Sequence, residues 1–321
     1  MLRVYLDQAK WIDLAKYRAG HPDGKKFETV FKTMPELVER GRVSFVLSCA
    51  HYFETQRRAK LESRYNLAWT MAELSRFHTI APPHAIVPAE IHEALVGDPL
   101  SDQLNLFGVG FNHAFKTNVS FGRIDPDLLE ALPPLQRTEF DEAFDWLVEF
   151  GALAVPPISS EIENRTFEAA LNIRDGDQMF ADTQAMQAAH VASNKLRGPR
   201  LSDWATASEI ADFLPALMAV CKRNAIDLDE VLTGKERIHR FLESLPSRWV
   251  SRELRRVRLR NPEQPWHPHD LNDVNALSIA VPYCDIVVTE RQWAAHINKE
   301  GLAEKYGTTV LHDLTKLTDH F

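Results

Sequence analysis

The sequence predicts an α/β protein whose mostly parallel sheet is interrupted by a large all-helical insertion. Three observations support this fold class. Short apolar segments at residues 2–6 and 43–47 each precede a helical pattern, the order found in βαβ units. Strand signals of the same kind return only at residues 285–289 and 308–311. Between about 127 and 260 the periodicity is helical, and no strand signal of any strength is present.

The composition is that of an ordinary globular chain. Of the 321 residues 45% are hydrophobic and 26% charged, and the formal net charge is −8. This acidic balance argues against a general nucleic-acid coat protein, but it leaves room for a nuclease, whose site is itself acidic. Three scattered cysteines without metal-ligand spacing indicate a reduced, cytoplasmic protein. No apolar run approaches the roughly 20 residues that span a bilayer, so no membrane partner is expected.

The first part of the chain reads as β-α-α-β-α. Asp7 stands at the end of the first strand, and Ser48 is a plausible N-cap for the helix after the second. The expected helices are 8–18, 25–39, 49–76 and 88–95, with an irregular extended segment at 77–87.

The remainder divides into a helical stretch and a return to α/β. Residues 98–126 have weak periodicity and suit either an ordered loop or a linker. The helices expected beyond them lie near 127–150, 160–174, 178–196, 203–223, 227–245, 247–258, 270–280 and 290–299, with a short one at the C-terminus. We therefore predict one discontinuous α/β domain, residues 1–97 and 268–321, interrupted by a helical insertion at 98–267 that shapes substrate access or binds a partner.

Four acidic residues occupy comparable places in this scheme. Asp7, Glu54, Asp273 and Glu290 each follow a predicted strand or lie near the start of a helix, and Asp270 lies nearby. The carboxyl ends of parallel strands share one edge of a sheet, so residues distant in sequence can converge there. Carboxylates without basic partners repel one another unless a divalent cation lies among them, and hard oxygen ligands suit Mg²⁺ or Mn²⁺. Such a cluster can activate a water and stabilise the leaving oxygen of a phosphodiester.

The segments that carry these acids resemble a known family. Val4-Tyr5-Leu6-Asp7, Ser48 to Thr55, and Asp273 to Trp293 are similar to the motifs of PIN domains, which are metal-dependent nucleases. The resemblance covers roughly residues 1–95 and 268–321. It implies a three-layer α/β/α fold with a PIN-like sheet, a ribonuclease activity and a nucleic-acid partner, RNA rather than DNA. The fold often pairs, so a homodimer is one expected state.

The resemblance also implies roles for individual residues. Asp7, Glu54 and Asp273 would be metal ligands, and Thr289 would orient the site by hydrogen bonding. Glu290 would take a fourth catalytic position, where an Asp is more usual. We add Asp270 to the metal ligands because of its place beside Asp273.

Each acid also has a purely structural interpretation. Asp7 could cap the following helix. Glu54 could be a solvated helix residue paired with Arg57 or Arg58. Asp273 could be an acid favoured by the dipole of a helix whose N-cap is Asp270.

Two histidine motifs and one further acid receive weaker predictions. His267-Pro268-His269-Asp270 could bind a transition metal, although a surface joint is the simpler interpretation. His51 lies three residues before Glu54 and could contact substrate or be a half-buried structural residue. Asp285 precedes its strand, so we expect it at the opposite edge of the sheet in a structural role.

One basic run leads into the predicted catalytic segment. Its arginines would suit a phosphate-backbone track, with Trp249 or Trp266 available for base stacking. The alternatives are a solvated helix face paired with Glu253, or a cradle for the protein's own acids. The run consists of Arg248, Arg252, Arg255, Arg256, Arg258 and Arg260.

The favoured function is a Mg²⁺- or Mn²⁺-dependent nuclease, most simply a ribonuclease. A phosphatase that forms an aspartyl-phosphate on Asp7 would want a second Asp two residues later, where Ala9 stands. The alternative from another class is a catalytically silent interaction protein, in which the helical region binds a partner or nucleic acid.

Overall fold

The computed structural model of the chain describes residues 1–119, 133–155, 178–261 and 265–321. The helix predicted at 160–174 lies outside these ranges, as do the ends of the segments predicted at 98–126 and 127–150.

The centre of the molecule is a four-stranded parallel sheet with the order β2-β1-β5-β6. In register, Val4 lies between Phe45 on β2 and Ile286 on β5, and Val287 pairs with Val310 on β6. All four predicted strands are thus confirmed, as is the α/β class. Their bounds are β1 (Leu2–Leu6), β2 (Val43–Val46), β5 (Ile286–Val288) and β6 (Thr309–Leu311).

A second, two-stranded sheet was not predicted. β3 (His78–Ile80) and β4 (Phe107–Val109) pair antiparallel, and an isolated parallel bridge between Leu47 and Thr79 places β3 beside the end of β2. The sequence predicted irregular structure for both segments. Both strands are short and contain polar residues or glycine (His78-Thr79-Ile80 and Phe107-Gly108-Val109), so neither forms an apolar run.

The N-terminal helices follow the predicted order with one break. The predicted helix 49–76 is divided by a turn at residues 57–60, and the helix predicted at 88–95 begins earlier, at Pro83, because proline is well tolerated in the first helical turn. Their bounds are α1 (Gln8–Arg18), the 3₁₀ helix η1 (Pro22–Phe27), α2 (Glu28–Glu39), α3 (Cys49–Gln56), α4 (Leu61–Ser75), α5 (Pro83–Val96), α6 (Leu100–Gln103) and α7 (Gly110–Phe115).

Helices dominate the rest of the described chain, and residues 178–193 are also helical. The other bounds are α9 (Pro134–Ala154), α11 (Gly198–Arg223), α12 (Leu228–Leu232), α13 (Lys235–Glu243), α14 (Pro246–Leu259), α15 (Asp270–Tyr283), α16 (Arg291–Lys299), α17 (Leu302–Tyr306) and the 3₁₀ helix η2 (Leu314–His320). No helix of the described ranges is both long and apolar enough to cross a membrane.

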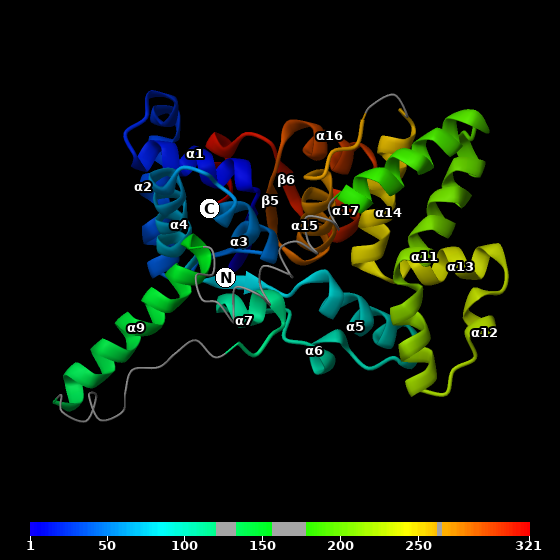
Figure 1. Cartoon of the computed structure of the whole chain (residues 1–321), viewed down its shortest axis with the longest axis horizontal. Coiled ribbons are helices and arrows are strands. Elements are labelled where there is room, and N and C mark those ends of the chain that lie inside the picture. Colours follow the sequence, from blue (N-terminus) through cyan, green and yellow to red (C-terminus); the bar gives the residue numbers. More distant parts are fainter. Residues whose placement is uncertain (120–132, 156–177, 262–264) are drawn as a thin grey trace.

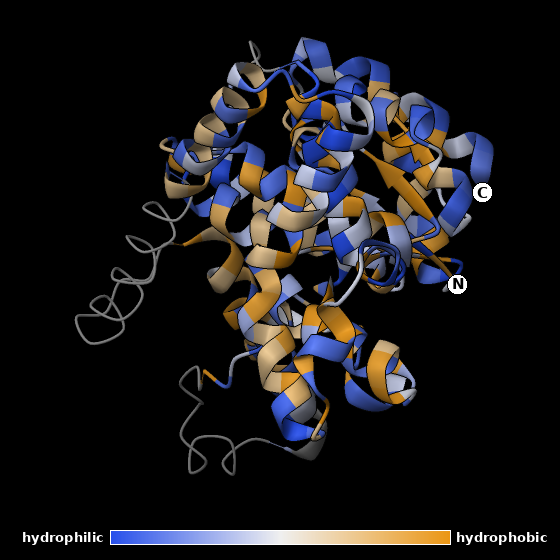
Figure 2. Cartoon of the chain, turned by 90° about the vertical axis from the view of Figure 1, so that its right-hand side faces the viewer, coloured by the Kyte–Doolittle hydropathy of each residue, from blue (hydrophilic) through white to orange (hydrophobic). Residues whose placement is uncertain are grey.

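Both faces of the sheet are covered by hydrophobic cores, since successive side chains of a strand point to opposite faces. Val4 and Leu6 belong to a core shared with α1, α2 and α4, whereas Tyr5 faces a second core shared with α5, α14, α15 and α16. Figure 1 shows these two groups of helices on either side of the strands. In Figure 2 the strands are largely hydrophobic, and the surrounding helices carry hydrophilic stretches.

The described part of the predicted insertion is built into the same cores. Leu153 of α9 joins the first core, and Leu254 of α14 joins the second. A third core unites α11 and α13 with Ile91 of α5. Figure 1 shows α9 on one side of the sheet and α11 to α13 on the other. Residues 97 and 268, the predicted boundaries, therefore do not bound the hydrophobic core.

Candidate active site

The candidate site lies at the carboxyl edge of the parallel sheet, between β1 and β5. From β1 the chain proceeds to β2 on one side, and from β5 it proceeds to β6 on the other. Such a reversal of strand order opens a crevice beyond the strand ends, where open α/β sheets bind ligands. Asp7 follows β1 and Thr289 follows β5, so both stand at this crevice.

Asp7 is held firmly at the end of β1. Its side chain is only 9% exposed, and its backbone N–H donates to the Val288 carbonyl at 2.9 Å. The Thr289 hydroxyl donates to Asp7 Oδ2 at 2.8 Å, as predicted for an orienting residue. Asp7 is the N-cap residue of α1, but its side chain makes no capping hydrogen bond.

The environment of Asp7 disfavours its charge. Burial raises the pKa of its carboxyl, and the negative charge of Glu290 raises it further against the opposing Thr289 hydrogen bond. Lys10 lowers the pKa of Asp7, but less than burial raises it. The carboxyl is therefore poorly compensated by the protein alone.

Asp273 lies in the first turn of α15 and interacts electrostatically with Asp7, although the two residues are near opposite ends of the sequence. Its Oδ2 accepts a hydrogen bond of 3.1 Å from the indole N–H of Trp293, on α16. Burial, together with the charges of Asp7, Glu54 and Glu290, raises the pKa of Asp273 to about 8. The four predicted acids thus form one electrostatically coupled group.

Glu54 and Glu290 complete this group from two further helices. Glu54 is half-buried near the end of α3, and its charge raises the pKa values of Asp273 and of Tyr5. Glu290 is exposed at the N-cap of α16 and acts on Asp7 and Asp273. Among the four acids Glu290 is the most accessible to solvent.

His51 supports the site from within the protein. It is 1% exposed; its Nδ1 accepts from the Ser48 N–H at 2.8 Å, and its Nε2 lies 2.9 Å from the Leu6 carbonyl. Because a carbonyl only accepts, Nε2 must carry the proton. Burial lowers the pKa of His51 to about 4, so the ring is neutral. His51 therefore ties β1 to the start of α3 in the structural role that was one of its two predictions.

The acids fit a hard divalent cation in chemistry and charge. All four offer carboxylate oxygens, which suit Mg²⁺ or Mn²⁺, and their mutual repulsion is what a cation relieves. Among the described residues no three His, Cys, Asp or Glu side chains are grouped tightly enough to hold a metal ion as they stand. The side chains of the half-buried Glu54 and the exposed Glu290 would have to close on the two aspartates.

Asp270 has a different role from the metal ligand that was predicted. It is 4% exposed, pairs with Arg258 at 3.0 Å and accepts the His267 N–H at 2.7 Å. These partners occupy its carboxylate and fasten α15 to α14. The neighbouring rings of His267 and His269 stack with centroids 5.2 Å apart, and both residues are exposed.

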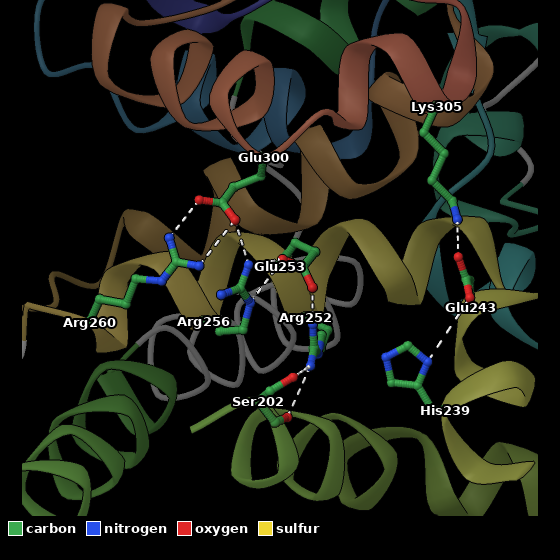
Figure 3. Close-up of polar contacts among 9 residues, drawn as sticks. All are labelled: Ser202, His239, Glu243, Arg252, Glu253, Arg256, Arg260, Glu300 and Lys305. Carbon is green, nitrogen blue, oxygen red and sulfur yellow. Dashed lines mark hydrogen bonds and ion pairs between the residues drawn. The ribbon is translucent and has the colours of Figure 1, made fainter. Parts of the chain in front are cut away.

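The arginine run is likewise corrected. Arg248 and Arg255 pair with the fully buried Glu209. Arg256 and Arg260 pair with Glu300 (Figure 3). Four of the six arginines are buried, Arg256 is half-buried, and Arg260 is exposed. The run cradles the protein's own acids, one of the predicted alternatives, instead of forming a track for a phosphate backbone.

Asp285 lies at the opposite edge of the sheet, as predicted. Its Oδ2 accepts the Arg3 N–H at 2.6 Å, and its own N–H donates to the Arg3 carbonyl at 2.9 Å. The contribution of Trp293 was not predicted. Its position one helical turn after Glu290 is the only signal in the sequence that could have pointed to it.

No family model, curated protein or solved structure matches this chain. The function must therefore be inferred from the site itself.

Proposed function

We propose that the protein is a metal-dependent nuclease, a ribonuclease in the first instance, with a three-layer α/β/α arrangement of the PIN type. The observation that carries this proposal is the coupling of Asp7, Glu54, Asp273 and Glu290. They come from four separate segments of the chain near the crevice between β1 and β5. The charges of Asp7, Glu54 and Glu290 raise the pKa of Asp273, and the charge of Glu290 raises that of Asp7. Burying two like-charged groups together is costly, and it is typical of sites that receive a cation.

In this proposal Asp7, Glu54 and Asp273 hold Mg²⁺ or Mn²⁺. When bound, the cation would polarise the phosphodiester and favour attack by water. Thr289 binds one oxygen of Asp7, and Trp293 binds one oxygen of Asp273. These hydrogen bonds fix the direction of the other oxygen of each carboxylate. Glu290, the most exposed acid, accepts the proton of the attacking water.

The test compares the wild type with Asp7→Asn, Asp273→Asn and Glu290→Gln on end-labelled single-stranded RNA and DNA. We expect Mn²⁺-dependent cleavage that EDTA abolishes. Both aspartate variants should be inactive, and Glu290→Gln should lose about 100-fold or more, the usual contribution of a general base. Asp102→Asn, at an exposed acid of α6, is the matched control and should retain full activity.

Two outcomes would contradict the proposal. Cleavage that persists in both aspartate variants would show that another site, or a contaminant, is responsible. No cleavage by the wild type on either substrate would favour the catalytically silent interaction protein. The observation that favours this alternative is that the acidic side chains of the described residues are not already grouped around a metal position.

A further inference from the structure

A pocket of about 210 Å³ lies between α3 and α15, the two helices that carry Glu54 and Asp273. Phe53, in its wall, immediately precedes Glu54, and Asn272 immediately precedes Asp273. The pocket therefore adjoins the candidate active site, but none of the four acids lines it.

The size of the pocket limits what it can hold. Sites for drug-sized ligands usually measure about 300–1,000 Å³, so about 210 Å³ suits a single planar ring system and not a whole nucleotide. The walls at Pro83, Ala276 and Ile279 are apolar, as expected of a surface that covers ring faces. The ligand that fits is thus a flat heterocycle whose remaining groups stay outside.

Two amide side chains of the pocket come from one face of α15. Asn272 and Asn275 are three residues apart on α15, so their side chains lie next to each other, and neither forms a side-chain hydrogen bond with another described residue. Each amide offers a donor and an acceptor, the combination that recognises the hydrogen-bonding edge of a base.

An aromatic ring completes the set. Phe53 is held in an edge contact with Phe115, with centroids 4.9 Å apart and an interplanar angle of 83°. A ring fixed in this way can stack against a base without losing further side-chain freedom, and stacking on aromatic residues is common in single-strand recognition.

We propose that this pocket binds one unpaired nucleobase of a single-stranded nucleic acid, the base adjacent to the phosphodiester at the acidic site. Phe53 stacks on the base, and Asn272 and Asn275 bind its edge. The inference rests on the proposed nuclease function and adds to it a position-specific base preference. Duplex substrates are excluded, because a paired base cannot enter the pocket without leaving its stack.

The first experiment measures base binding without cleavage. Cys49 lines the pocket and is partly exposed, whereas Cys221 and Cys284 are buried, so alkylation of Cys49 reports on access. Burial raises the pKa of the Cys49 thiol to about 11, and alkaline buffer will make the rate measurable. In EDTA, at least one of adenosine, guanosine, cytidine and uridine at millimolar concentration should slow alkylation, as followed by mass spectrometry.

Variants identify the groups that bind. Asn272→Ala and Asn275→Ala should each weaken nucleoside protection about fivefold to tenfold, while Asn261→Ala, exposed at the end of α14, should not. Two separate alanine variants guard against one that folds poorly. N-acetyl-tryptophanamide tests for a general aromatic site: protection equal to that by the nucleosides would overturn the assignment to a base.

The second experiment measures cleavage of oligoribonucleotides that differ at one base. The base that protects Cys49 should also be preferred beside the cut, and Asn275→Ala should reduce that preference at least fivefold. Cleavage without base preference and without nucleoside protection would overturn the pocket but leave the nuclease in place. Nucleoside protection without any cleavage would support the pocket and refute the nuclease.

Discussion

At the scale of single residues, the site is built from charges that the folded protein does not stabilise. The pKa of Asp273 is raised to about 8 because it is half-buried beside other acids, and a single hydrogen bond from Trp293 opposes this effect only in part. Groups placed in this way reduce stability so that another component can be bound. In the absence of metal, this destabilisation should be measurable in the free energy of unfolding.

The variant Asp273→Asn should therefore be more stable than the wild type, and the difference should grow with pH. Folding raises the pKa of Asp273. The contribution of its protonated carboxyl to the free energy of unfolding is therefore fully present at acidic pH and is lost as pH rises from about 4 through about 8. Asparagine does not ionise and can still accept from Trp293. Above pH 8 we expect Asp273→Asn to be about 2 kcal/mol more stable to unfolding than the wild type. A shift of one pKa unit corresponds to roughly 1.4 kcal/mol, and solvent screening reduces the total that the shift of Asp273 would give.

Urea unfolding in EDTA at pH 5 and pH 8.5 measures this difference. Asp102→Asn serves as the control, because the residue is exposed and distant from the four acids in sequence. If the free energies of unfolding of the wild type and of Asp273→Asn differed by the same amount at both pH values, Asp273 would not be held in a protonated state.

Binding of Mn²⁺ should release protons at neutral pH. A carboxyl whose pKa is about 8 is mostly protonated at pH 7, and it must lose that proton to become a ligand. Affinity should therefore rise roughly tenfold per pH unit between pH 6 and 7. Calorimetry in buffers of different ionisation enthalpy will count the protons, and an affinity that does not change with pH would remove Asp273 from the ligand set.

At the scale of elements, the function of α15 depends on its attachment to α14. Arg258 pairs with Asp270 at 3.0 Å, and its guanidinium lies 4.7 Å from the ring centroid of Trp266 and 5.6 Å from that of Trp293. Trp293 in turn donates to Asp273. A chain of contacts thus leads from the buried ion pair to the candidate active site.

Replacing Asp270 with Ala should destabilise the protein by about 3–5 kcal/mol, because Arg258 would be left as an uncompensated buried charge. This is opposite in sign to the effect of Asp273→Asn. Adding Arg258→Met should restore part of the loss, which a double-mutant cycle of urea unfolding measures. The predicted role of Asp270 as a ligand would be supported by a different result. In that case Asp270→Ala would bind Mn²⁺ more weakly without being less stable, and adding Arg258→Met would not restore the affinity.

The elements that the sequence predicted well are those with strong local signals. The strands of the parallel sheet are apolar runs bounded by polar residues, and Asp7, Glu54 and Asp273 were placed by their order along such elements. The strands β3 and β4 contain polar residues or glycine and form no apolar run, and the turn at 57–60 contains no Gly or Pro. Local pattern could not identify either feature.

The arginine run shows a different limit. Six arginines on one stretch look like a basic surface, because Glu253 is the sole acidic residue between Arg248 and Arg260. Their other acidic partners lie on other helices or beyond them: Glu209 and Asp212 on α11, Asp270 on α15, and Glu300 after α16. Whether a charged run is exposed depends on tertiary packing, which the sequence pattern of one helix does not contain.

At the scale of the whole molecule, the described chain shares its cores across the predicted domain boundary. The second core joins strand residues with Leu104, Val250, Leu254 and Trp266, all from the predicted insertion. Side chains of this kind contribute about 1.5–3 kcal/mol each when fully buried. Four of them together approach the about 5–15 kcal/mol by which a native protein is stable.

Excision of residues 98–267, with a Gly/Ser linker from 97 to 268, should therefore give a chain that does not fold. The shortened chain would lose β4 as partner of β3 and would expose the face of α15 that α14 covers. We expect no cooperative thermal transition and strong binding of a hydrophobic dye, with the full chain as reference. A sharp transition and dispersed amide resonances would show that residues 1–97 and 268–321 are a domain by themselves. Any Mn²⁺-dependent cleavage by that fragment would then place the whole active site within it.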